Sequence, residues 1–255
     1  MRAWQAVPPF GIAALQLVEL ERPVPGPHQV LIRLRAASLN YRDLEMATGT
    51  YQGQPQQAFV LLSDGAGEVV EVGAAVTGFS PGDRVSGCFW QGWEAGRLGD
   101  SHAAIPLGGP LDGMLGEYAL LDEQGVVHCP AHLSWEEAAT LPCAALTAWQ
   151  ALIVEGQLKA GDWVLVQGTG GVSLFAQQFA LLHGARVIVT SSRDDRLQQM
   201  VKLGAAGTIN YRSMPDWHEQ VMAITAGRGV DHVLEVGGPQ SFAQSLRCLR
   251  PSGQV

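Results

Sequence analysis

The chain has 255 residues, of which 47% are hydrophobic and 16% are charged, and its formal net charge is −8. This length and composition predict one large or two ordinary folded domains and argue against a disordered chain. The acidic balance disfavours nucleic acid or an anionic membrane surface as the main partner.

The first half of the chain has the pattern of short strands separated by turns. Residues 30–35 and 69–72 alternate apolar and polar side chains, as half-buried strands do, and residues 116–121 form another such strand. Residues 81–83, Pro-Gly-Asp, have the composition of a tight turn. Closely spaced strands of this kind predict a β-rich, barrel-like domain over residues 1–127.

From residue 128 onward the pattern changes. Ser134, followed by Glu136 and Glu137, is typical of a helix N-terminus, and a long apolar helical pattern comes after it. Strands and helices then alternate, with strands at 163–167, 186–190, 208–210 and 230–236 and helices at 171–183, 194–203, 215–226 and 241–249. This alternation predicts an α/β fold with a doubly wound parallel sheet, the Rossmann arrangement, over residues 128–255.

The predicted sheet is incomplete. Four parallel strands are present and residues 252–255 have the pattern of the start of a fifth, whereas a doubly wound dinucleotide fold uses six. We therefore expect the chain to be truncated at its C-terminus. Such a truncation leaves an unpaired sheet edge, so poor solubility or a need for a partner is expected.

A glycine-rich turn lies between the strand at 163–167 and the helix at 171–183. Its candidate cofactor-binding residues are Gly168, Thr169, Gly170, Gly171 and Val172. The first glycine permits the tight turn, the second lets a pyrophosphate approach the backbone, and the helix N-terminus supplies N–H groups. Glycine pairs also end strands for structural reasons alone, but the strand before and the helix after this turn favour dinucleotide binding.

The end of the second predicted strand indicates which dinucleotide binds. Ser191 occupies the position of the acidic residue that binds the ribose of NAD, and Ser192, Arg193 and Arg196 follow it. Hydroxyl and guanidinium groups suit a phosphate, so the sequence predicts NADPH as the cofactor. The alternative is that both arginines lie on a solvated helix face beside the acidic residues 194–195.

Five further motifs, spread along the chain, carry a resemblance to a known family. They are Gly26-Pro27-His28-Gln29-Val30-Leu31, Asn40-Tyr41-Arg42-Asp43, Asp64-Gly65-Ala66-Gly67-Glu68-Val69, Pro81-Gly82-Asp83-Arg84-Val85 and Leu146-Thr147-Ala148. Together with the glycine turn they resemble the medium-chain dehydrogenases/reductases, over nearly the whole chain. The resemblance implies a GroES-like catalytic domain before the Rossmann domain, and it is closest to the zinc-free quinone oxidoreductases, often labelled alcohol dehydrogenase-like. It also implies a homodimer for the full-length protein, and it adds Tyr211 and Gly237 to the cofactor site.

The same resemblance indicates where a catalytic zinc ion would bind. The three ligand positions of the family correspond to Asn40, Ser63 and Cys143, of which only Cys143 is a strong ligand. Asp64 offers a carboxylate, but two ligands of mixed type do not make a good zinc site. The favoured interpretation of Cys143 is a small buried apolar residue in a helix. We therefore expect no metal.

Without a Lewis acid, hydride transfer suits an acceptor that is already electron-poor, such as a quinone or an α,β-unsaturated carbonyl. Hydrogen-bond donors must then stabilise the developing oxyanion. The resemblance places Asn40, Tyr41 and Thr147 near the nicotinamide as candidate catalytic residues, although packing of the Tyr41 ring in a domain interface is the alternative. Asp43 is expected to hold Arg42 or a backbone turn.

The sequence thus predicts an NADPH-dependent oxidoreductase that acts on a small-molecule quinone or enone without a metal. Two alternatives stay open: an alcohol or aldehyde dehydrogenase with a residual metal site, and a non-catalytic NADPH-binding protein. The sequence shows no targeting segment, its most apolar window at 141–154 is too short to span a bilayer, and its four cysteines are scattered. These features predict a cytoplasmic protein with neither a membrane nor a nucleic acid partner.

Overall fold

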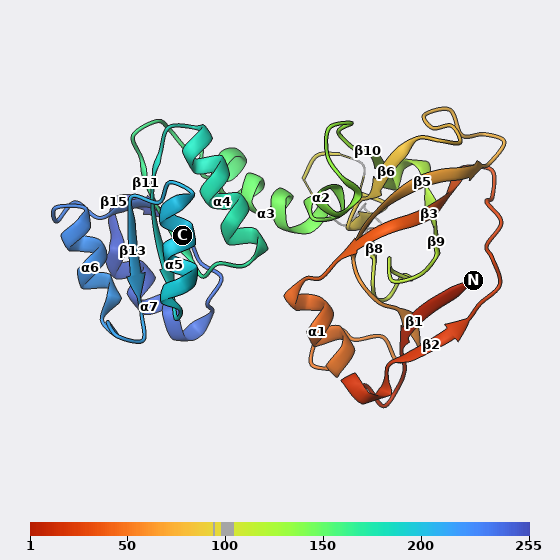
Figure 1. Ribbon diagram of the computed structural model, residues 1–255, viewed down its shortest axis with the longest axis horizontal. Coiled ribbons are helices and arrows are strands. Elements are labelled where there is room, and N and C mark those ends of the chain that lie inside the picture. Colours follow the sequence, from red (N-terminus) through yellow and green to blue (C-terminus); the bar gives the residue numbers. More distant parts are fainter. Residues whose placement is uncertain (94, 98–104) are drawn as a thin grey trace. The chain divides into compact units, whose positions relative to one another are not determined.

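The computed structural model describes residues 1–93, 95–97 and 105–255. The chain forms two compact units, unit 1 (Met1–Cys143) and unit 2 (Ala144–Val255), which are seen in Figure 1. Unit 1 is rich in antiparallel strands and unit 2 is an α/β unit with a parallel sheet. The predicted combination of a β-rich domain and a Rossmann-type sheet is therefore confirmed.

Unit 1 is built on a five-stranded antiparallel sheet with the order β10-β6-β5-β3-β9. Its strands are β3 (Gln29–Ser38), β5 (Asp64–Val72), β6 (Arg84–Gly87), β9 (Tyr118–Asp122) and β10 (Val126–His128). A smaller sheet joins β1 (Arg2–Ala6), β2 (Gln16–Glu19) and β4 (Phe59–Val60), and β7 (Trp90–Gln91) pairs with β8 (Ile105–Pro106). The helices are α1 (Tyr41–Thr48) and α2 (Trp135–Ala139), with 3-10 turns at Ile12–Ala14 and Glu123–Gly125.

The strands predicted at 30–35, 69–72 and 116–121 are present, but two of them are longer than the sequence pattern indicates. The first half of β5 contains Gly65 and Gly67, which interrupt the alternation of side chains. Gly67 is required there, because a Cβ atom at this position would lie 2.3 Å from the carbonyl oxygen of Arg33 on β3. Because the close approach of two strands requires glycine here, the first half of β5 lacks the alternating side-chain pattern that predicts a strand.

Unit 2 has a five-stranded parallel sheet with the order β13-β12-β11-β14-β15. Its strands are β11 (Trp163–Gln167), β12 (Arg186–Ser191), β13 (Gly207–Asn210), β14 (Val230–Leu234) and β15 (Leu249–Gln254). Its helices are α4 (Gly171–Leu182), α5 (Asp194–Lys202), α6 (Trp217–Ile224) and α7 (Pro239–Cys248). This order is that of the first five strands of the doubly wound dinucleotide fold.

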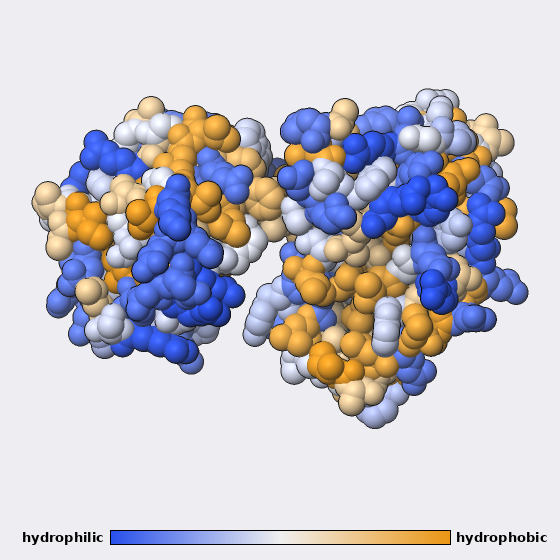
Figure 2. Space-filling view, in the orientation of Figure 1, coloured by the Kyte–Doolittle hydropathy of each residue, from blue (hydrophilic) through white to orange (hydrophobic). Residues whose placement is uncertain are grey.

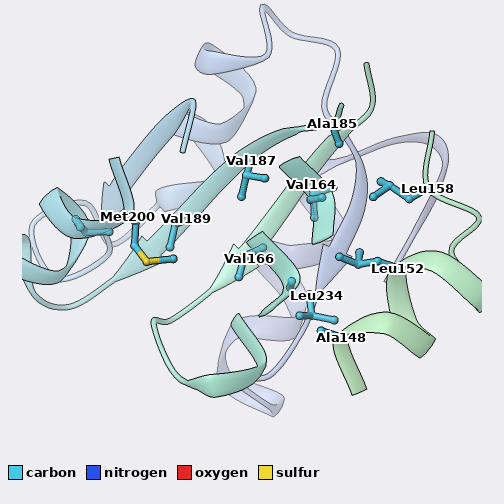
Figure 3. Packing of buried hydrophobic residues seen from close by; sticks show 13 residues of the cluster. Ala148, Leu152, Leu158, Val164, Val166, Ala185, Val187, Val189, Met200 and Leu234 are labelled. Atoms are coloured by element: carbon cyan, nitrogen blue, oxygen red, sulfur yellow. The ribbon is translucent and has the colours of Figure 1, made fainter. Parts of the chain in front are cut away.

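Apolar side chains cover both faces of this sheet. In β11, Val164 and Val166 point to one face, where they pack with residues of α4 and α5 (Figure 3). Leu165 points to the other face, toward Trp217 and Val221 of α6. Because the strand is buried on both faces, it reads as a continuous apolar run, which is how the sequence revealed it.

The predicted long helix after Ser134 is divided in the structure. Ser134 caps α2 as expected, since its Oγ accepts a hydrogen bond from the backbone N–H of Glu137 at 3.1 Å. The chain then continues as a π-helical segment (Leu141–Ala145), α3 (Leu146–Trp149) and a second π-helical segment (Gln150–Glu155). Pro142 lacks the N–H that a regular α-helix needs near this point, and wider turns follow it.

None of the helices in the described part of the chain combines the length and apolar character that crossing a bilayer requires.

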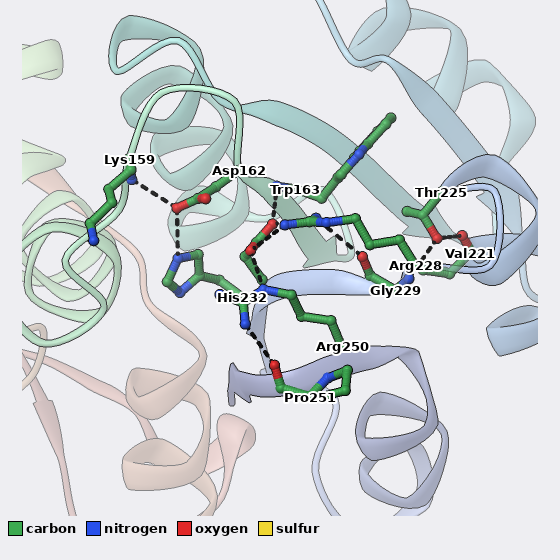
Figure 4. Close-up of polar contacts among 11 residues, drawn as sticks. Lys159, Asp162, Trp163, Val221, Thr225, Arg228, Gly229, His232, Arg250 and Pro251 are labelled. Atoms are coloured by element: carbon green, nitrogen blue, oxygen red, sulfur yellow. Dashed lines mark hydrogen bonds and ion pairs between the residues drawn. The ribbon is translucent and has the colours of Figure 1, made fainter.

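A polar network joins the amino ends of three strands of unit 2 (Figure 4). Asp231 of β14 is 1% exposed, and it accepts hydrogen bonds from Arg228 at 2.7 and 2.8 Å and from the backbone N–H of Trp163 at 2.8 Å. Arg250 of β15 also donates to it. Burial alone would raise the pKa of Asp231, but these hydrogen bonds outweigh it and hold the pKa far below its ordinary value.

Replacing Asp231 by alanine is expected to lower the free energy of unfolding by about 2–3 kcal/mol. Removing one partner of a buried ion pair costs about 3–5 kcal/mol, and the partial exposure of Arg228 and Arg250 reduces this figure because water still reaches them. Since the pKa is depressed in the folded state, the stabilisation is present above the ordinary value of 3.8 and is lost as the pH falls below it. Urea unfolding at pH 7 and pH 3 measures both effects.

The difference between wild type and Asp231→Ala should be smaller at pH 3 than at pH 7. Glu117→Ala is the matched control, because Glu117 pairs with Arg2 on the surface of unit 1 and contributes little. A loss as large in the control as in Asp231→Ala would contradict a special role for the buried network.

Candidate functional site

The predicted cofactor residues of unit 2 lie at the carboxyl ends of its parallel strands. Gly168 follows β11 and has a φ of +73°, a left-handed conformation that favours glycine. Its N–H donates to the carbonyl oxygen of Thr190 on β12 at 2.7 Å, which fixes the turn against the next strand. Gly170 is the N-cap of α4, so Gly171 and Val172 form the first turn of the helix with N–H groups that have no partner within it.

The glycine turn leaves room for a ligand. A Cβ atom added at Gly170 would meet no other atom within 4 Å, and one at Gly168 would meet only the Ser173 hydroxyl at 3.9 Å. Ser173 replaces the third glycine of the usual fingerprint, and its hydroxyl donates to the carbonyl oxygen of Gln167 at 2.7 Å. The open space beside the helix N-terminus fits a pyrophosphate group.

The end of β12 and the turn after it carry the residues predicted to choose the dinucleotide. Ser191 is 4% exposed, and its hydroxyl accepts a hydrogen bond from the backbone N–H of Arg193 at 3.3 Å. The Arg196 guanidinium lies 3.4 Å from the Thr169 hydroxyl of the glycine turn, so the two predicted segments meet. The backbone N–H of Tyr211 donates to the carbonyl oxygen of Ser191 at 3.1 Å. Ser192 is the residue that follows Ser191 in the chain.

A cavity of about 420 Å³ lies at this edge of the sheet, within the size range of small-molecule sites. It is lined by Thr169, Leu174, Arg193, Asp195, Arg196, Gln199, Met200 and Leu203. The lining therefore combines apolar side chains with two guanidinium groups and the carboxylate of Asp195.

Gly237 lies in the turn after β14, which Glu235 organises. One oxygen of the Glu235 carboxylate accepts hydrogen bonds from the backbone N–H groups of Gly237 at 2.7 Å and Gly238 at 3.0 Å. The other oxygen accepts from Gln167 at 2.7 Å, and Ser245 also donates to it. The carboxylate thereby joins the end of β11 to the turn that carries Gly237.

A second cluster lies in unit 1, around the N-terminus of α1. The Asn40 side-chain amide donates to the Asp64 carboxylate at 2.9 Å, and the backbone N–H of Cys143 donates to the same oxygen at 3.1 Å. Asp64 is fully buried, and its other carboxylate oxygen has no hydrogen-bond partner among the described residues. Asp64 therefore fixes the orientation of the Asn40 amide.

Two neighbours hold this cluster in place. Asp43 accepts a hydrogen bond from the backbone N–H of Asn40 at 2.7 Å, so it holds the first turn of α1, as predicted. Arg42 donates to the Ser63 hydroxyl at 2.9 Å and to the carbonyl oxygens of Leu107 at 3.0 Å and Gly109 at 2.7 Å. Its guanidinium therefore ties α1 to the segment before β5 and to the loop at 107–109.

Burial controls the protonation of the cluster. It raises the pKa of Asp64, and hydrogen bonds from Cys143 and Asn40 offset part of that rise. Burial likewise raises the pKa of Asp43. Burial and the nearby Asp64 carboxylate hold the pKa of the Cys143 thiol far above its ordinary range, so the thiol stays protonated.

These donors do not fit a catalytic zinc ion. Zinc sites draw three protein ligands from thiolate, imidazole and carboxylate groups, whereas the three positions that the family resemblance indicates hold an amide, a hydroxyl and one cysteine, so only one of the three is a strong zinc ligand. The Ser63 hydroxyl already accepts a hydrogen bond from a cationic guanidinium, which repels a second cation. Across residues 1–93, 95–97 and 105–255, no three His, Cys, Asp or Glu side chains converge as metal ligands.

Cys143 lies in a helical segment, as predicted, but the interpretation that it is buried among apolar groups is corrected. It lies in the π-helical segment and is half-buried, and a carboxylate borders it.

Of the three candidate catalytic residues, Asn40 belongs to the cluster in unit 1 and the other two are exposed. Tyr41 is the first residue of α1 and is 76% exposed, and Thr147 lies on α3 of unit 2.

Sequence reasoning missed three contributors to these sites. Glu235 and Arg42 act through partners that are distant in the chain, so no local pattern marks them. Asp195 lines the cavity, but in the sequence it is only one of two adjacent acidic residues at the start of a predicted helix. Its position two residues after Arg193 is the one available signal.

Comparison with known proteins gives matches along most of the chain. Residues 26–131 match the family model of the alcohol dehydrogenase GroES-like domain, and residues 171–255 match that of the zinc-binding dehydrogenases. A zinc-type alcohol dehydrogenase-like protein of Schizosaccharomyces pombe is 48% identical over 232 residues, which cover 90% of this chain and 67% of that protein.

Solved structures agree with these matches. The crystal structure of an NAD-dependent alcohol dehydrogenase is 36% identical with a TM-score of 0.90, over 99% of this chain and 76% of that one. The quinone oxidoreductase of Pseudomonas syringae is 30% identical with a TM-score of 0.82, over 99% of this chain and 71% of that one.

Proposed function

The chain belongs to the medium-chain dehydrogenase/reductase superfamily of oxidoreductases, and from that premise we propose that it reduces quinones or α,β-unsaturated carbonyls with NADPH and without a metal. Membership implies a nicotinamide cofactor and a small-molecule substrate. The choice of NADPH and of an electron-poor acceptor is our proposal.

The cofactor assignment is supported by the residues at the carboxyl edge of the parallel sheet. Gly168, Gly170 and the first turn of α4 would hold the pyrophosphate, and Ser191 leaves the ribose position without the acidic side chain that NAD prefers. Arg193 and Arg196 provide positive charge for a 2′-phosphate. When bound, the nicotinamide supplies the hydride.

The acceptor assignment is supported by the cluster in unit 1. Asn40 is the candidate donor to the oxygen that gains negative charge, because Asp64 uses only one of its amide hydrogens. Asp64 positions that amide, and Asp43 holds the helix turn from which it projects. Tyr41 and Thr147 are further candidate donors, since both carry a hydroxyl and both residues are exposed.

The single observation that carries the metal-independent proposal is the contact between Arg42 and Ser63. A guanidinium 2.9 Å from the hydroxyl places a fixed positive charge beside the position at which zinc-dependent members of this family would have a zinc-binding residue. An acceptor at this site therefore lacks a Lewis acid and must be activated by its own conjugation.

Turnover of the purified protein with a panel of quinones, enones and simple alcohols tests the proposal. NADPH oxidation by a quinone or enone is expected to survive treatment with a chelator, and NADPH is expected to bind more tightly than NADH. Stoichiometric zinc together with alcohol oxidation that chelation abolishes would instead support a metal-dependent alcohol dehydrogenase. Cofactor binding without any turnover would support a non-catalytic NADPH-binding protein.

A further inference from the structure

The cavity beside the glycine turn contains a carboxylate as well as two guanidinium groups. Its lining includes Arg193, Asp195 and Arg196, from the start of α5, together with Thr169 of the glycine turn. The part of unit 2 that carries α5 is hydrophilic, as Figure 2 shows. A negative charge inside a site proposed for a phosphate calls for an explanation.

The two arginines have different partners. Arg193 forms a two-point ion pair with Asp195, with Nε 3.0 Å from one carboxylate oxygen and Nη2 2.6 Å from the other. Arg196 contacts the Thr169 hydroxyl at 3.4 Å and pairs with no carboxylate in the described part of the chain. The charge of Arg196 is therefore available to a ligand, whereas the charge of Arg193 is paired with that of Asp195.

The neighbouring acid does not share this role. Asp194 accepts a hydrogen bond from the side-chain amide of Asn210 at 2.6 Å, which ties it to the end of β13, and it is not part of the cavity lining. Two adjacent carboxylates at the same helix terminus are thus directed to different places, and only Asp195 reaches the cationic part of the cavity.

We propose that Asp195 limits the preference of the site for a 2′-phosphate by competing with that phosphate for the guanidinium of Arg193. A carboxylate and a phosphate both bind the same planar pair of guanidinium N–H groups, so they exclude each other. The ion pair is an exchangeable one, because both side chains are 58% exposed and such pairs are weak. The proposal rests on the proposed function for the identity of the ligand alone.

The carboxylate acts on a bound phosphate in two ways. Before binding it must be displaced from Arg193, and after binding it remains as a like charge close to the phosphate. Both effects weaken ligands that carry a 2′-phosphate and leave those without one unaffected. Asp195 therefore reduces a preference for NADPH that Arg193 and Arg196 create.

The test is the variant Asp195→Asn, which keeps the size of the side chain and removes its charge. Dissociation constants are measured for NADPH and NADH, and for adenosine 2′-monophosphate and 5′-monophosphate as smaller probes. NADPH and the 2′-monophosphate are expected to bind about three- to tenfold more tightly than to wild type, the scale set by the loss of one exposed ion pair and one like charge. NADH and the 5′-monophosphate should change less than about twofold by the same reasoning.

Asp194→Asn is the matched control, and it should leave all four dissociation constants unchanged. The same substitution at Asp195 is also made in an Arg193→Ala background, where there is no guanidinium left to compete for. There the gain for NADPH should shrink to less than half of its value in the wild-type background. A full gain in that background, an equal gain for NADH, or no gain at all would overturn the proposal.

The proposed preference for NADPH and the proposed role of Asp195 can be contradicted independently of each other. Equal binding of NADPH and NADH by the wild-type protein contradicts the proposed cofactor preference, while the comparison of the two monophosphates still tests Asp195. A wild-type preference for NADPH that Asp195→Asn leaves unchanged contradicts the role of Asp195 alone.

Discussion

Replacing Gly170 by valine is expected to abolish dinucleotide binding without unfolding the protein. The φ of Gly170 is −80° and its ψ is −177°, values that valine adopts freely, and a Cβ atom there meets no other atom within 4 Å. The added methyl groups fill the space that a pyrophosphate would occupy. Two charge-assisted hydrogen bonds to the phosphates, each worth about 1.5–3 kcal/mol, would be lost, which raises the dissociation constant about 100-fold or more.

Isothermal titration with NADPH measures the loss, and thermal unfolding followed by circular dichroism measures the fold. The unfolding temperature should fall by a few degrees at most, because valine is a poorer N-cap than glycine but strains no contact. Gly11→Val serves as the control, since Gly11 also has open space around it and lies in unit 1. NADPH binding by Gly170→Val within threefold of wild type would exclude this turn as the pyrophosphate site.

Replacing Asn40 by alanine is expected to lower kcat by about 100- to 1000-fold, the usual effect of removing one oxyanion donor. The amide is held by the buried Asp64 carboxylate, so in the wild-type protein it needs no reorganisation before it donates to the acceptor. NADPH binding should change little, because the glycine turn and the arginines lie in the other unit. The effect should therefore appear in kcat and leave the cofactor dissociation constant within about twofold of wild type.

Gln54→Ala is the control for Asn40→Ala. Gln54 is another side-chain amide of unit 1, and it donates to the carbonyl oxygen of Met46 at 2.6 Å, outside the cluster. Asp64→Asn adds a graded test, since an amide at position 64 weakens the contact that orients Asn40, and it should give an intermediate kcat. An Asn40→Ala variant with wild-type kcat toward both a quinone and an enone would remove Asn40 from the reaction.

The α/β unit was predictable because its signals are local. Each strand is a short apolar run followed by glycine or a helix start, so β11 was predicted with its observed ends and α4, α5 and β12 differ from prediction by single residues. The helix α7 begins at Pro239, earlier than predicted, because proline suits the first turn of a helix.

The β-rich unit was less predictable because its elements depend on distant partners. The strand β4 has two residues and exists only through its pairing with β1. The helix α1 does have a local signal, because Asn40 and Asp43 have N-terminal capping spacing and Gly49 ends the helix in a left-handed conformation.

The residues of the candidate sites likewise divide into those with a local sequence signal and those whose role depends on distant partners. The glycine turn and the arginines were found from their spacing, whereas the carbonyl groups that bind Arg42 lie more than sixty residues away in the chain. No pattern within a short window carries that information, because the contact is set by packing between loops.

The Asp231 network joins the amino ends of β11, β14 and β15, while the residues assigned to the cofactor follow the carboxyl ends of the same sheet. Five residues of strand separate the two ends by about 15 Å, far enough that substitutions at one end should add to those at the other with little coupling. Evolution can therefore change cofactor preference at positions 191–196 without endangering the fold. The same positions can be changed by design, because the free energy that the Asp231 network contributes compensates for destabilising substitutions at the carboxyl edge.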